Sequence, residues 1–229
     1  MKCSEICALI EQEYGTEYAC DWDNVGLLAG RSTKEVKKIL LSLDATDEVV
    51  RMAAEGGYDM LITHHPMLFS AIKRVTDQDM NGRRLLELIR NDISYYAMHT
   101  NYDTRGMADL AARLMGLTEC AVLEEVKDGE GIGRVGKLPH PMTLRECGEQ
   151  VKVAYGIPNV RLFGDPDTQV SLVGICPGAG KSTMPLALGF GCDVYITGDI
   201  DHHTGIDAVD QGMCIIDAGH YGVEHIFME

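Results

Sequence analysis

The sequence lacks any hydrophobic run long enough to cross a bilayer. No segment of the 229 residues approaches the roughly 18–20 consecutive apolar residues of a membrane-spanning helix. The amino terminus carries an acidic residue, Glu5, within its first five positions, which is not typical of a signal peptide. We therefore expect no membrane partner and predict a cytoplasmic protein.

Cysteine pairs are also missing. The eight cysteines are scattered, without any Cys-x-x-Cys spacing, and this disfavours a cysteine-ligated metal site. In a reducing cytosol we expect most of them to be small buried hydrophobic side chains. The sequence likewise has no Ser-His-Asp or Cys-His order that would indicate a covalent nucleophile.

Basic residues are few. Lys and Arg number 20 against 35 Asp and Glu, which gives a formal charge of −15. A basic face for nucleic acid or for an anionic membrane is therefore not expected, whereas bound cations are compatible with this balance. With 45% hydrophobic and 24% charged residues, the composition is that of an ordinary globular protein of one large domain or two small ones.

Strands and helices alternate along the chain, which indicates an α/β layered fold. Apolar runs predict strands at 36–43, 58–63, 93–98, 133–138, 159–163, 169–176, 193–197 and 213–217. Helical spacing and capping residues predict helices at 4–14, 46–55, 81–90, 107–115, 183–188 and 205–211, and one that begins after Thr143. The acidic, glycine-bearing stretch 124–131 predicts a linker between a first α/β lobe, 1–124, and a second, 125–229.

The two halves of the sequence resemble each other. Residues 57–63 match residues 191–197 at Gly, Asp, Ile and Thr, and residues 24–27 match residues 159–162 in part. Each half also has a strand that ends in His-x-x-x-acid. We therefore predict two similar lobes related by internal duplication, with a metal site in the cleft between them.

Imidazole and carboxylate side chains follow the predicted strands at three places. These residues are the adjacent His64 and His65, the pair His99 and Asp103, and the pair His220 and Glu224. In a helical turn, an i,i+4 pair lies on one face, and α/β sheets place their sites beyond the carboxyl ends of strands. One such pair alone is typical of a solvent-facing turn, but the repeated set favours zinc, iron, manganese or nickel.

Two further segments are weaker candidates. Asp199 and His203 could be groups beside the metal or a proton shuttle, and the alternative is a plain polar loop. Residues 174–182 resemble a phosphate loop but fail its spacing, so a tight turn is the alternative to an anion site with Lys181 at a helix N-terminus. Trp22, the single tryptophan, is expected to be a packing anchor in a loop fixed by Asp23 and Asn24.

Five motifs together resemble the Nif-three-like dinuclear-metal-centre family, whose members often carry the name type 2 GTP cyclohydrolase I. The motifs are Trp22-Asp-Asn-Val-Gly-Leu27, Thr63-His-His-Pro66, His99-Thr-Asn-Tyr-Asp103, Gly198-Asp…His203 and Asp217-Ala-Gly-His-Tyr-Gly-Val-Glu224. The resemblance implies a two-lobed α/β subunit in a toroidal homohexamer with two metal ions. It implies the metal ligands His64, His65, Asp103, His220 and Glu224, with Glu224 bridging the ions. It also places His99 and His203 near the metals.

The sequence thus favours a dinuclear-metal-dependent hydrolase with a small-molecule substrate. The resemblance implies hydrolytic ring-opening of GTP, and hydrolysis of a phosphoester would use the same metal ions and side chains. His99 or His203 would be the general acid or base, and Lys181 with Ser182 would meet the phosphates of a nucleotide. The alternative is a non-catalytic, hexameric metal-binding or regulatory protein.

Overall fold

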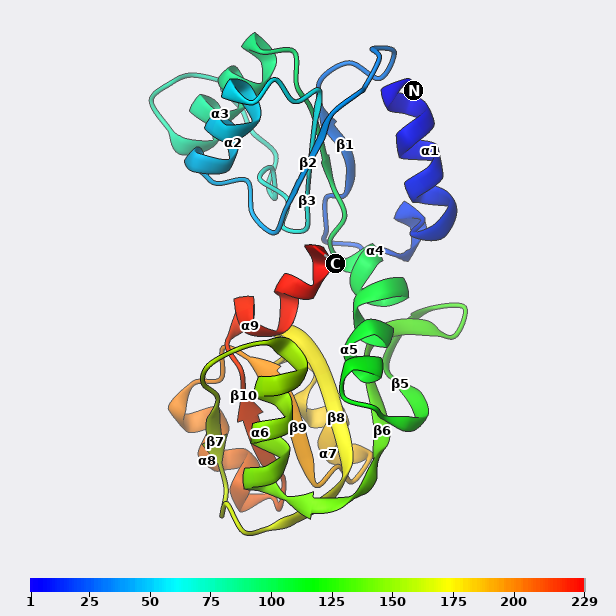
Figure 1. Ribbon diagram of the computed structural model, residues 1–229, viewed down its shortest axis with the longest axis vertical. Coiled ribbons are helices and arrows are strands. Elements are labelled where there is room, and N and C mark those ends of the chain that lie inside the picture. The colour runs from blue at the N-terminus through cyan, green and yellow to red at the C-terminus, as the bar shows by residue number, and fades with distance from the viewer. Residues whose placement is uncertain (229) are drawn as a thin grey trace. The chain divides into compact units, whose positions relative to one another are not determined.

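Two β-sheets, each in its own part of the chain, organise the protein, which we describe from a computed structural model of residues 1–228 (Figure 1). Residues 1–102 form a first compact unit, and residues 103–227 form a second. Each unit combines a sheet with packed helices, so the predicted α/β class is confirmed.

The first sheet has four strands in the order β1-β4-β3-β2. They are β1 (Gly26–Ala29), β2 (Ile39–Ser42), β3 (Met60–Thr63) and β4 (Ser94–Ala97). β2, β3 and β4 are parallel, and β1 pairs antiparallel with β4. Every residue of β3 and β4 is buried, as expected for central strands covered on both faces.

Helices cover both faces of this sheet. They are α1 (Cys3–Glu13), α2 (Asp47–Glu55) and α3 (Met80–Arg90), and a short 3₁₀ turn spans Thr16–Tyr18. The adjacent residues Tyr95 and Tyr96 of β4 point to opposite faces. Tyr95 packs in the apolar core beneath α2 and α3, whereas the hydroxyl of Tyr96 faces Glu11 of α1. The predicted cap of α2 is confirmed, because the Thr46 side chain accepts a hydrogen bond from the Val49 N–H.

The hydroxyl of Tyr95 connects the sheet to the His65 loop. It accepts a hydrogen bond from the Met67 N–H at 2.7 Å and lies 2.8 Å from the Thr63 hydroxyl. Replacing Tyr95 by phenylalanine is expected to lower the free energy of unfolding by about 1–2 kcal/mol, because the buried Met67 N–H loses its acceptor. Chemical denaturation measures this change. Tyr96→Phe is the matched control, since the Tyr96 hydroxyl has only a long contact of 3.4 Å to Glu11. An equal loss in both variants would contradict the role of the Tyr95 hydroxyl.

The second sheet has six strands in the order β5-β6-β8-β9-β10-β7. They are β5 (Thr118–Lys127), β6 (Glu130–Thr143), β7 (Arg161–Phe163), β8 (Gln169–Ala179), β9 (Val194–Gly198) and β10 (Cys214–Asp217). β8, β9 and β10 are parallel, and β7 pairs antiparallel with β10. Four strands in the order β7-β10-β9-β8 therefore have the arrangement of β1-β4-β3-β2, which agrees with the predicted duplication.

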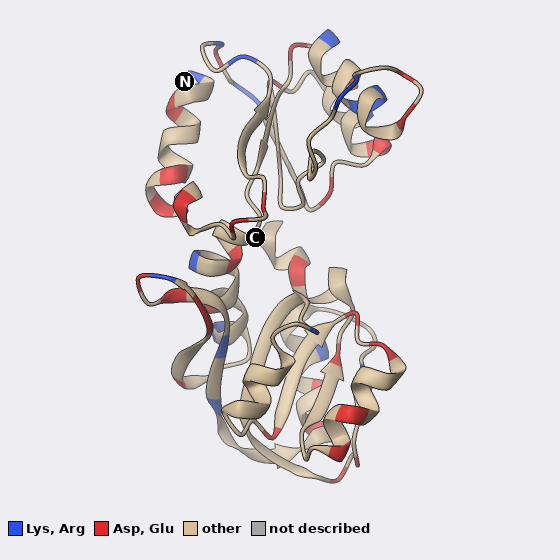
Figure 2. Cartoon of the chain, turned by 180° about the vertical axis from the view of Figure 1, so that it is seen from behind, with Lys and Arg blue, Asp and Glu red and all other residues tan. Residues whose placement is uncertain are grey.

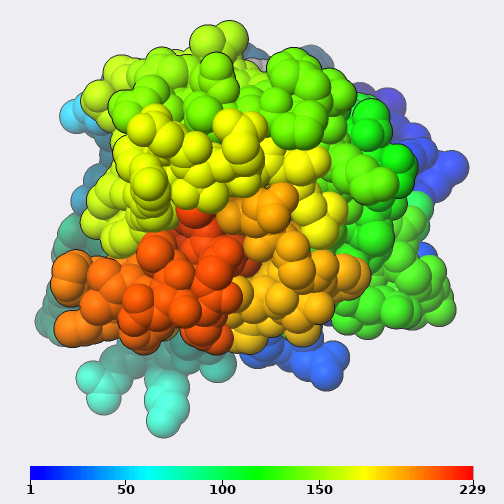
Figure 3. Space-filling model, turned by 90° about the horizontal axis from the view of Figure 1, so that it is seen from below, coloured from blue at the N-terminus to red at the C-terminus, as the bar shows by residue number. Residues whose placement is uncertain are grey.

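Helices of the second unit pack on its sheet and continue from its strands. They are η2, a π-helical turn (Asp103–Met107), α5 (Ala108–Leu114), α6 (Leu144–Tyr155), α7 (Met184–Gly189), α8 (His202–Asp210) and α9 (His220–Glu224). Two short pieces, α4 (Thr100–Tyr102) and the 3₁₀ turn His225–Met228, complete the order. The predicted capping box of α6 is confirmed by mutual bonds between Thr143 and Glu146. In Figure 3 the segments of the second unit coloured yellow, orange and orange-red lie next to one another.

The division of the chain differs from the predicted one. The units meet between Tyr102 and Asp103, earlier than the expected boundary after residue 124, because η2 and α5 pack against β6 and β8. Residues 124–131 are not a linker. They belong to the β5–β6 hairpin, whose tight turn uses Asp128 and Gly129 with positive φ angles. Asp103 accordingly belongs to the second unit.

The remaining compositional predictions can be checked against the structure. No helix within residues 1–228 is both long and apolar enough to cross a membrane. Six of the eight free cysteines are buried, Cys20 is half-buried and Cys120 is exposed, so the prediction of mostly buried cysteines is confirmed. Figure 2 shows acidic positions spread over both units, as the net charge of −15 requires.

Candidate metal centre

Three histidines gather at the carboxyl end of the first sheet. His64 and His65 directly follow β3, and His99 follows the neighbouring strand β4. Each offers a ring nitrogen, and these three atoms lie within 4.8 Å of one another. Parallel strands place their carboxyl ends at one edge of a sheet, which explains how residues far apart in the sequence meet here.

Each of these imidazoles is held through its Nδ1 atom by an oxygen. The Nδ1 of His64 lies 2.9 Å from the Met98 carbonyl, that of His65 lies 2.9 Å from Asp44, and that of His99 lies 3.0 Å from Asp23. A carbonyl or an ionised carboxylate can only accept, so Nδ1 carries the proton in each ring. Nε2 is then the atom that would bind a metal. Metal-ligating histidines are characteristically oriented in this way.

Two carboxylates hold histidines of this cluster, and Asp23, beside His99, is more buried than Asp44, beside His65. The side chain of Asp23 is fully buried, and it accepts bonds from the Thr100 N–H at 3.0 Å and the Thr100 hydroxyl at 2.6 Å. Burial raises the pKa of Asp23, but the hydrogen bonds from His99 and Thr100 outweigh it and lower the pKa to about 2. Asp23 is thus an anion at neutral pH.

The second unit presents a histidine with the same kind of support. His220 begins α9, and its Nδ1 lies 2.9 Å from Asp199, which follows β9. Its Nε2 lies 2.9 Å from the carboxylate of Glu224, one helical turn later, in a residue that is 3% exposed. The hydrogen bond to Glu224 is the largest cause that raises the pKa of His220 to about 9, and Asp199 adds to it. The predicted i,i+4 geometry of this pair is confirmed.

The glycine-bearing end of β8 lies against this pair. Gly178 has a φ of +79°, and a Cβ atom there would lie 2.3 Å from Oε1 of Glu224 and 3.8 Å from Nε2 of His220. Only glycine, which has no Cβ atom, leaves space beside the Glu224 carboxylate and the His220 ring. The glycine at this position of the phosphate-loop-like segment is therefore explained by the close approach of the backbone to Glu224.

The other predicted site residues are placed as follows. Asp103 opens η2, with its Oδ1 buried. His203 is exposed on α8 and lies beside the ring of His202. Lys181 is exposed and donates to Asp201 at 2.6 Å, and Ser182 is exposed just before the short helix α7. The roles predicted for these four residues stay predictions.

Sequence reasoning missed Asp44 and misjudged Trp22. Asp44 follows β2, a parallel neighbour of β3, so its place at the same sheet edge was the signal that could have found it. Trp22 is 59% exposed, so the expected packing anchor is wrong. The prediction that Asp23 and Asn24 fix this loop is confirmed, because the Asp23 carboxylate accepts from the Thr100 N–H and the Asn24 amide donates to the Leu68 carbonyl.

The donor chemistry of these groups fits a metal ion. Neutral imidazole and carboxylate suit zinc, iron, manganese and nickel, and the supporting oxygens fix which ring nitrogen faces outward. The histidine cluster of the first unit and the His220–Glu224 pair of the second could therefore hold metal.

Comparison with known proteins places the chain among relatives along its whole length. Residues 1–229 match the family described as Duf34/NIF3 (NGG1p interacting factor 3). A GTP cyclohydrolase 1 type 2 homolog from Clostridium perfringens is 35% identical over 228 residues, which cover 98% of this chain and 87% of the relative. A protein of the same name from Streptococcus pneumoniae is also 35% identical, over 235 residues that cover 100% and 88%.

Solved structures agree with this relationship. A Bacillus cereus protein related to NIF3 matches with a TM-score of 0.92 and 25% identity, over 97% of this chain and 89% of that one. Reduced HcgD from Methanocaldococcus jannaschii matches with a TM-score of 0.87 and 32% identity, over 100% and 90%.

Proposed function

This chain belongs to the Duf34/NIF3 family, and on that premise we propose that it is a metal-dependent hydrolase with two divalent ions. The proposed ligands are those carried by the resemblance, His64, His65, Asp103, His220 and Glu224. The observation that most favours the proposal is a feature that three of the histidines share. His64, His65 and His220 each have Nδ1 held by an oxygen, which directs Nε2 toward a prospective ion.

The residues have separate tasks in this proposal. Divalent ions, when bound, supply Lewis-acid polarisation of the scissile bond and lower the pKa of a water nucleophile. Asp23 holds the His99 ring in one tautomer through Nδ1, which leaves Nε2 as the atom that would accept or donate a proton. His220 and Glu224 share a proton across their 2.9 Å contact, and an ion bound to both residues would displace this proton to solvent. His203, exposed on α8, is the second proposed acid or base.

The proposed substrate is a small molecule with a hydrolysable ring or phosphoester. GTP is the leading candidate because relatives carry the name GTP cyclohydrolase 1 type 2 homolog. Lys181 would have to exchange its ion pair with Asp201 for a substrate phosphate. We also propose a homohexamer, as the resemblance implies. Light scattering tests it by a mass six times that of the 25.1 kDa chain.

Removing the metal is expected to abolish hydrolysis. Protein treated with a chelator and then dialysed should lose turnover of GTP and of a simple aryl phosphoester. Addition of manganese, iron or zinc should restore it for at least one of the three ions, because polarisation of the scissile bond depends on the ion. Elemental analysis reports metal content alongside. Turnover that survives complete removal of metal would contradict the proposal, and His203→Ala and His99→Ala then test the two proposed proton carriers.

A further inference from the structure

A small cavity in the first unit borders His65 on the side of α2 and α3. Its volume is about 280 Å³, near the small end of the range of ligand pockets, about 300–1,000 Å³. It therefore fits one chemical group of a substrate better than a whole nucleotide. The polar side chains that line it belong to Asp44, Thr46, His65, Asn81 and Arg84.

Arg84 brings unused hydrogen-bond donors to this cavity. Its side chain is only 16% exposed, and its Nε donates to Asp47 at 2.6 Å. Within residues 1–228, neither Nη atom of Arg84 donates a hydrogen bond to a protein atom, nor does the side-chain amide of Asn81. A guanidinium presents a planar fork of donors that matches the oxygens of a carboxylate or phosphate.

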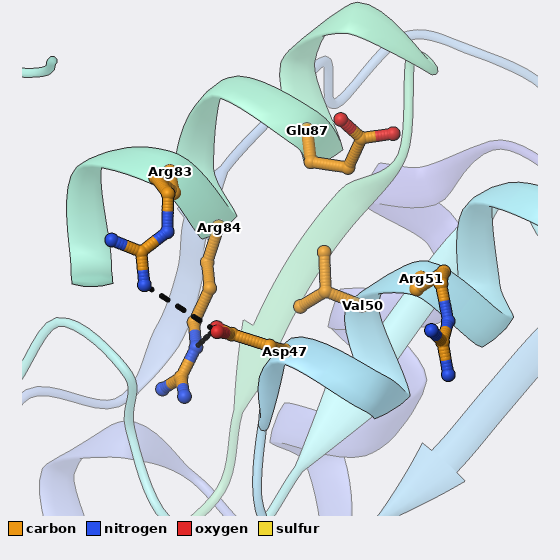
Figure 4. Close-up of a pocket in the computed structure, with 6 residues that line it drawn as sticks. All are labelled: Asp47, Val50, Arg51, Arg83, Arg84 and Glu87. Atoms are coloured by element: carbon orange, nitrogen blue, oxygen red, sulfur yellow. Dashed lines mark hydrogen bonds and ion pairs between the residues drawn. The ribbon is translucent and has the colours of Figure 1, made fainter. Parts of the chain in front are cut away.

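The charges around Arg84 balance, since Arg83 and Arg84 lie near two carboxylates, those of Asp47 and Asp44. Figure 4, a close-up of a second pocket that Arg84 also lines, shows the guanidinium groups of Arg83 and Arg84 directed at the one carboxylate of Asp47, whereas Arg51 points away. The contacts to Asp47 are 3.5 Å from Arg83 and 2.6 Å from Arg84, so two cations share one anion. The other nearby carboxylate, Asp44, accepts from the Nδ1 of His65. The preference for an oxyanion would therefore come from the guanidinium donors of Arg84 and not from an excess of positive charge.

We propose that this cavity binds an oxyanion of the substrate, a phosphate or a carboxylate, with Arg84 and Asn81 as its donors. The inference rests on the proposed function in one respect, because it takes His65 as a metal ligand. The oxyanion would then lie beside the metal centre, and Arg84 and Asn81 would position the substrate for hydrolysis. The site also differs from the Lys181 loop, which belongs to the other unit.

Calorimetric titration of the metal-loaded, full-length protein with inorganic phosphate and with acetate tests the proposal. Arg84→Gln is expected to raise the Kd of the bound anion about tenfold or more, since a hydrogen-bonded charge is lost. Asn81→Ala should raise it about threefold without touching the Arg84–Asp47 bond, which guards against a folding defect. The matched control is Arg83→Gln, which removes the same charge one residue away but does not line the cavity.

Three results would overturn the proposal. The first is that neither phosphate nor acetate binds the wild-type protein. The second is an equal loss of affinity in Arg83→Gln and Arg84→Gln, which would indicate diffuse charge. The third is a loss in Glu224→Gln but none in Arg84→Gln, which would place the anion on the metal. Failure of the proposed function is separate, because a protein without hydrolytic activity can still show Arg84-dependent anion binding.

Discussion

Replacing Glu224 by alanine is expected to remove bound metal and to lower the rate of hydrolysis by more than about 100-fold, because loss of even an outer partner of a ligand typically costs 10–100-fold. Glu224 is 3% exposed and its carboxylate lies 2.9 Å from Nε2 of His220. Its removal deletes one proposed ligand and leaves the other without its partner. The pKa of His220 should also fall from about 9, since the hydrogen bond to Glu224 is its largest cause.

Two further variants make the Glu224 experiment specific. Glu224→Gln keeps the shape of the side chain but removes its charge, so it should fold like the parent and still lose metal. Asp210→Ala changes the net charge by the same amount at the last residue of α8, and it should keep both metal and turnover. Elemental analysis and steady-state rates give the two readouts. An unchanged rate of hydrolysis in Glu224→Ala would contradict the proposal of a metal-dependent hydrolase.

Replacing Asp23 by alanine is expected to lower the free energy of unfolding by about 2–4 kcal/mol, because several buried donors lose one common acceptor. These donors are the Nδ1 of His99 and the N–H and hydroxyl of Thr100, which is 3% exposed. Chemical denaturation measures the loss. Asp21→Ala, at the exposed neighbouring position, is the matched control and should change the stability little. A loss of similar size in both variants would show that the Asp23 bonds contribute nothing of their own.

The Asp23 effect has a definite pH dependence. Its pKa is about 2 in the folded protein, below the ordinary 3.8 of an aspartate side chain, so the folded state favours the ionised form. The stability that Asp23 contributes is therefore fully present above about pH 4 and is lost as the pH falls through about 2. Denaturation at a series of pH values should show this decline in the wild type and a shallower one in Asp23→Asn. Parallel curves would contradict it.

Local sequence signals predicted the elements of this fold well. The Thr143–Glu146 capping box and the Thr46 cap fix helix starts through bonds within four residues, so no knowledge of the rest of the chain is needed. The hairpin at 124–131 was mistaken for a linker because its charged and glycine residues are typical of loops. The pairing of β5 with β6, and of β6 with the distant strand β8, shows that these residues belong to a sheet.

The histidines and acids of the candidate site can be picked out in the sequence, but the residues that hold them in place cannot. Adjacent histidines at a strand end and two i,i+4 pairs are visible as spacing in the sequence. Asp44 is joined to His65 across 21 positions and Asp23 to His99 across 76, and such bonds depend on strand order. Trp22 was misjudged because a large apolar side chain is usually buried, whereas here polar bonds hold the loop and leave the ring outside.

Asp44 takes part in two separate interactions, since it accepts a hydrogen bond from His65 and also lines the cavity beside it. A metal ion on the far nitrogen of His65 would make the Nδ1 proton more acidic and draw the charge of Asp44 toward the ring. Less of that charge would then repel an oxyanion near Arg84. Binding of the proposed metal and of the proposed oxyanion would then be thermodynamically linked. The factor by which the metal raises oxyanion affinity would equal the factor by which the oxyanion raises metal affinity. The substrate would help to retain the ion on which its own hydrolysis depends.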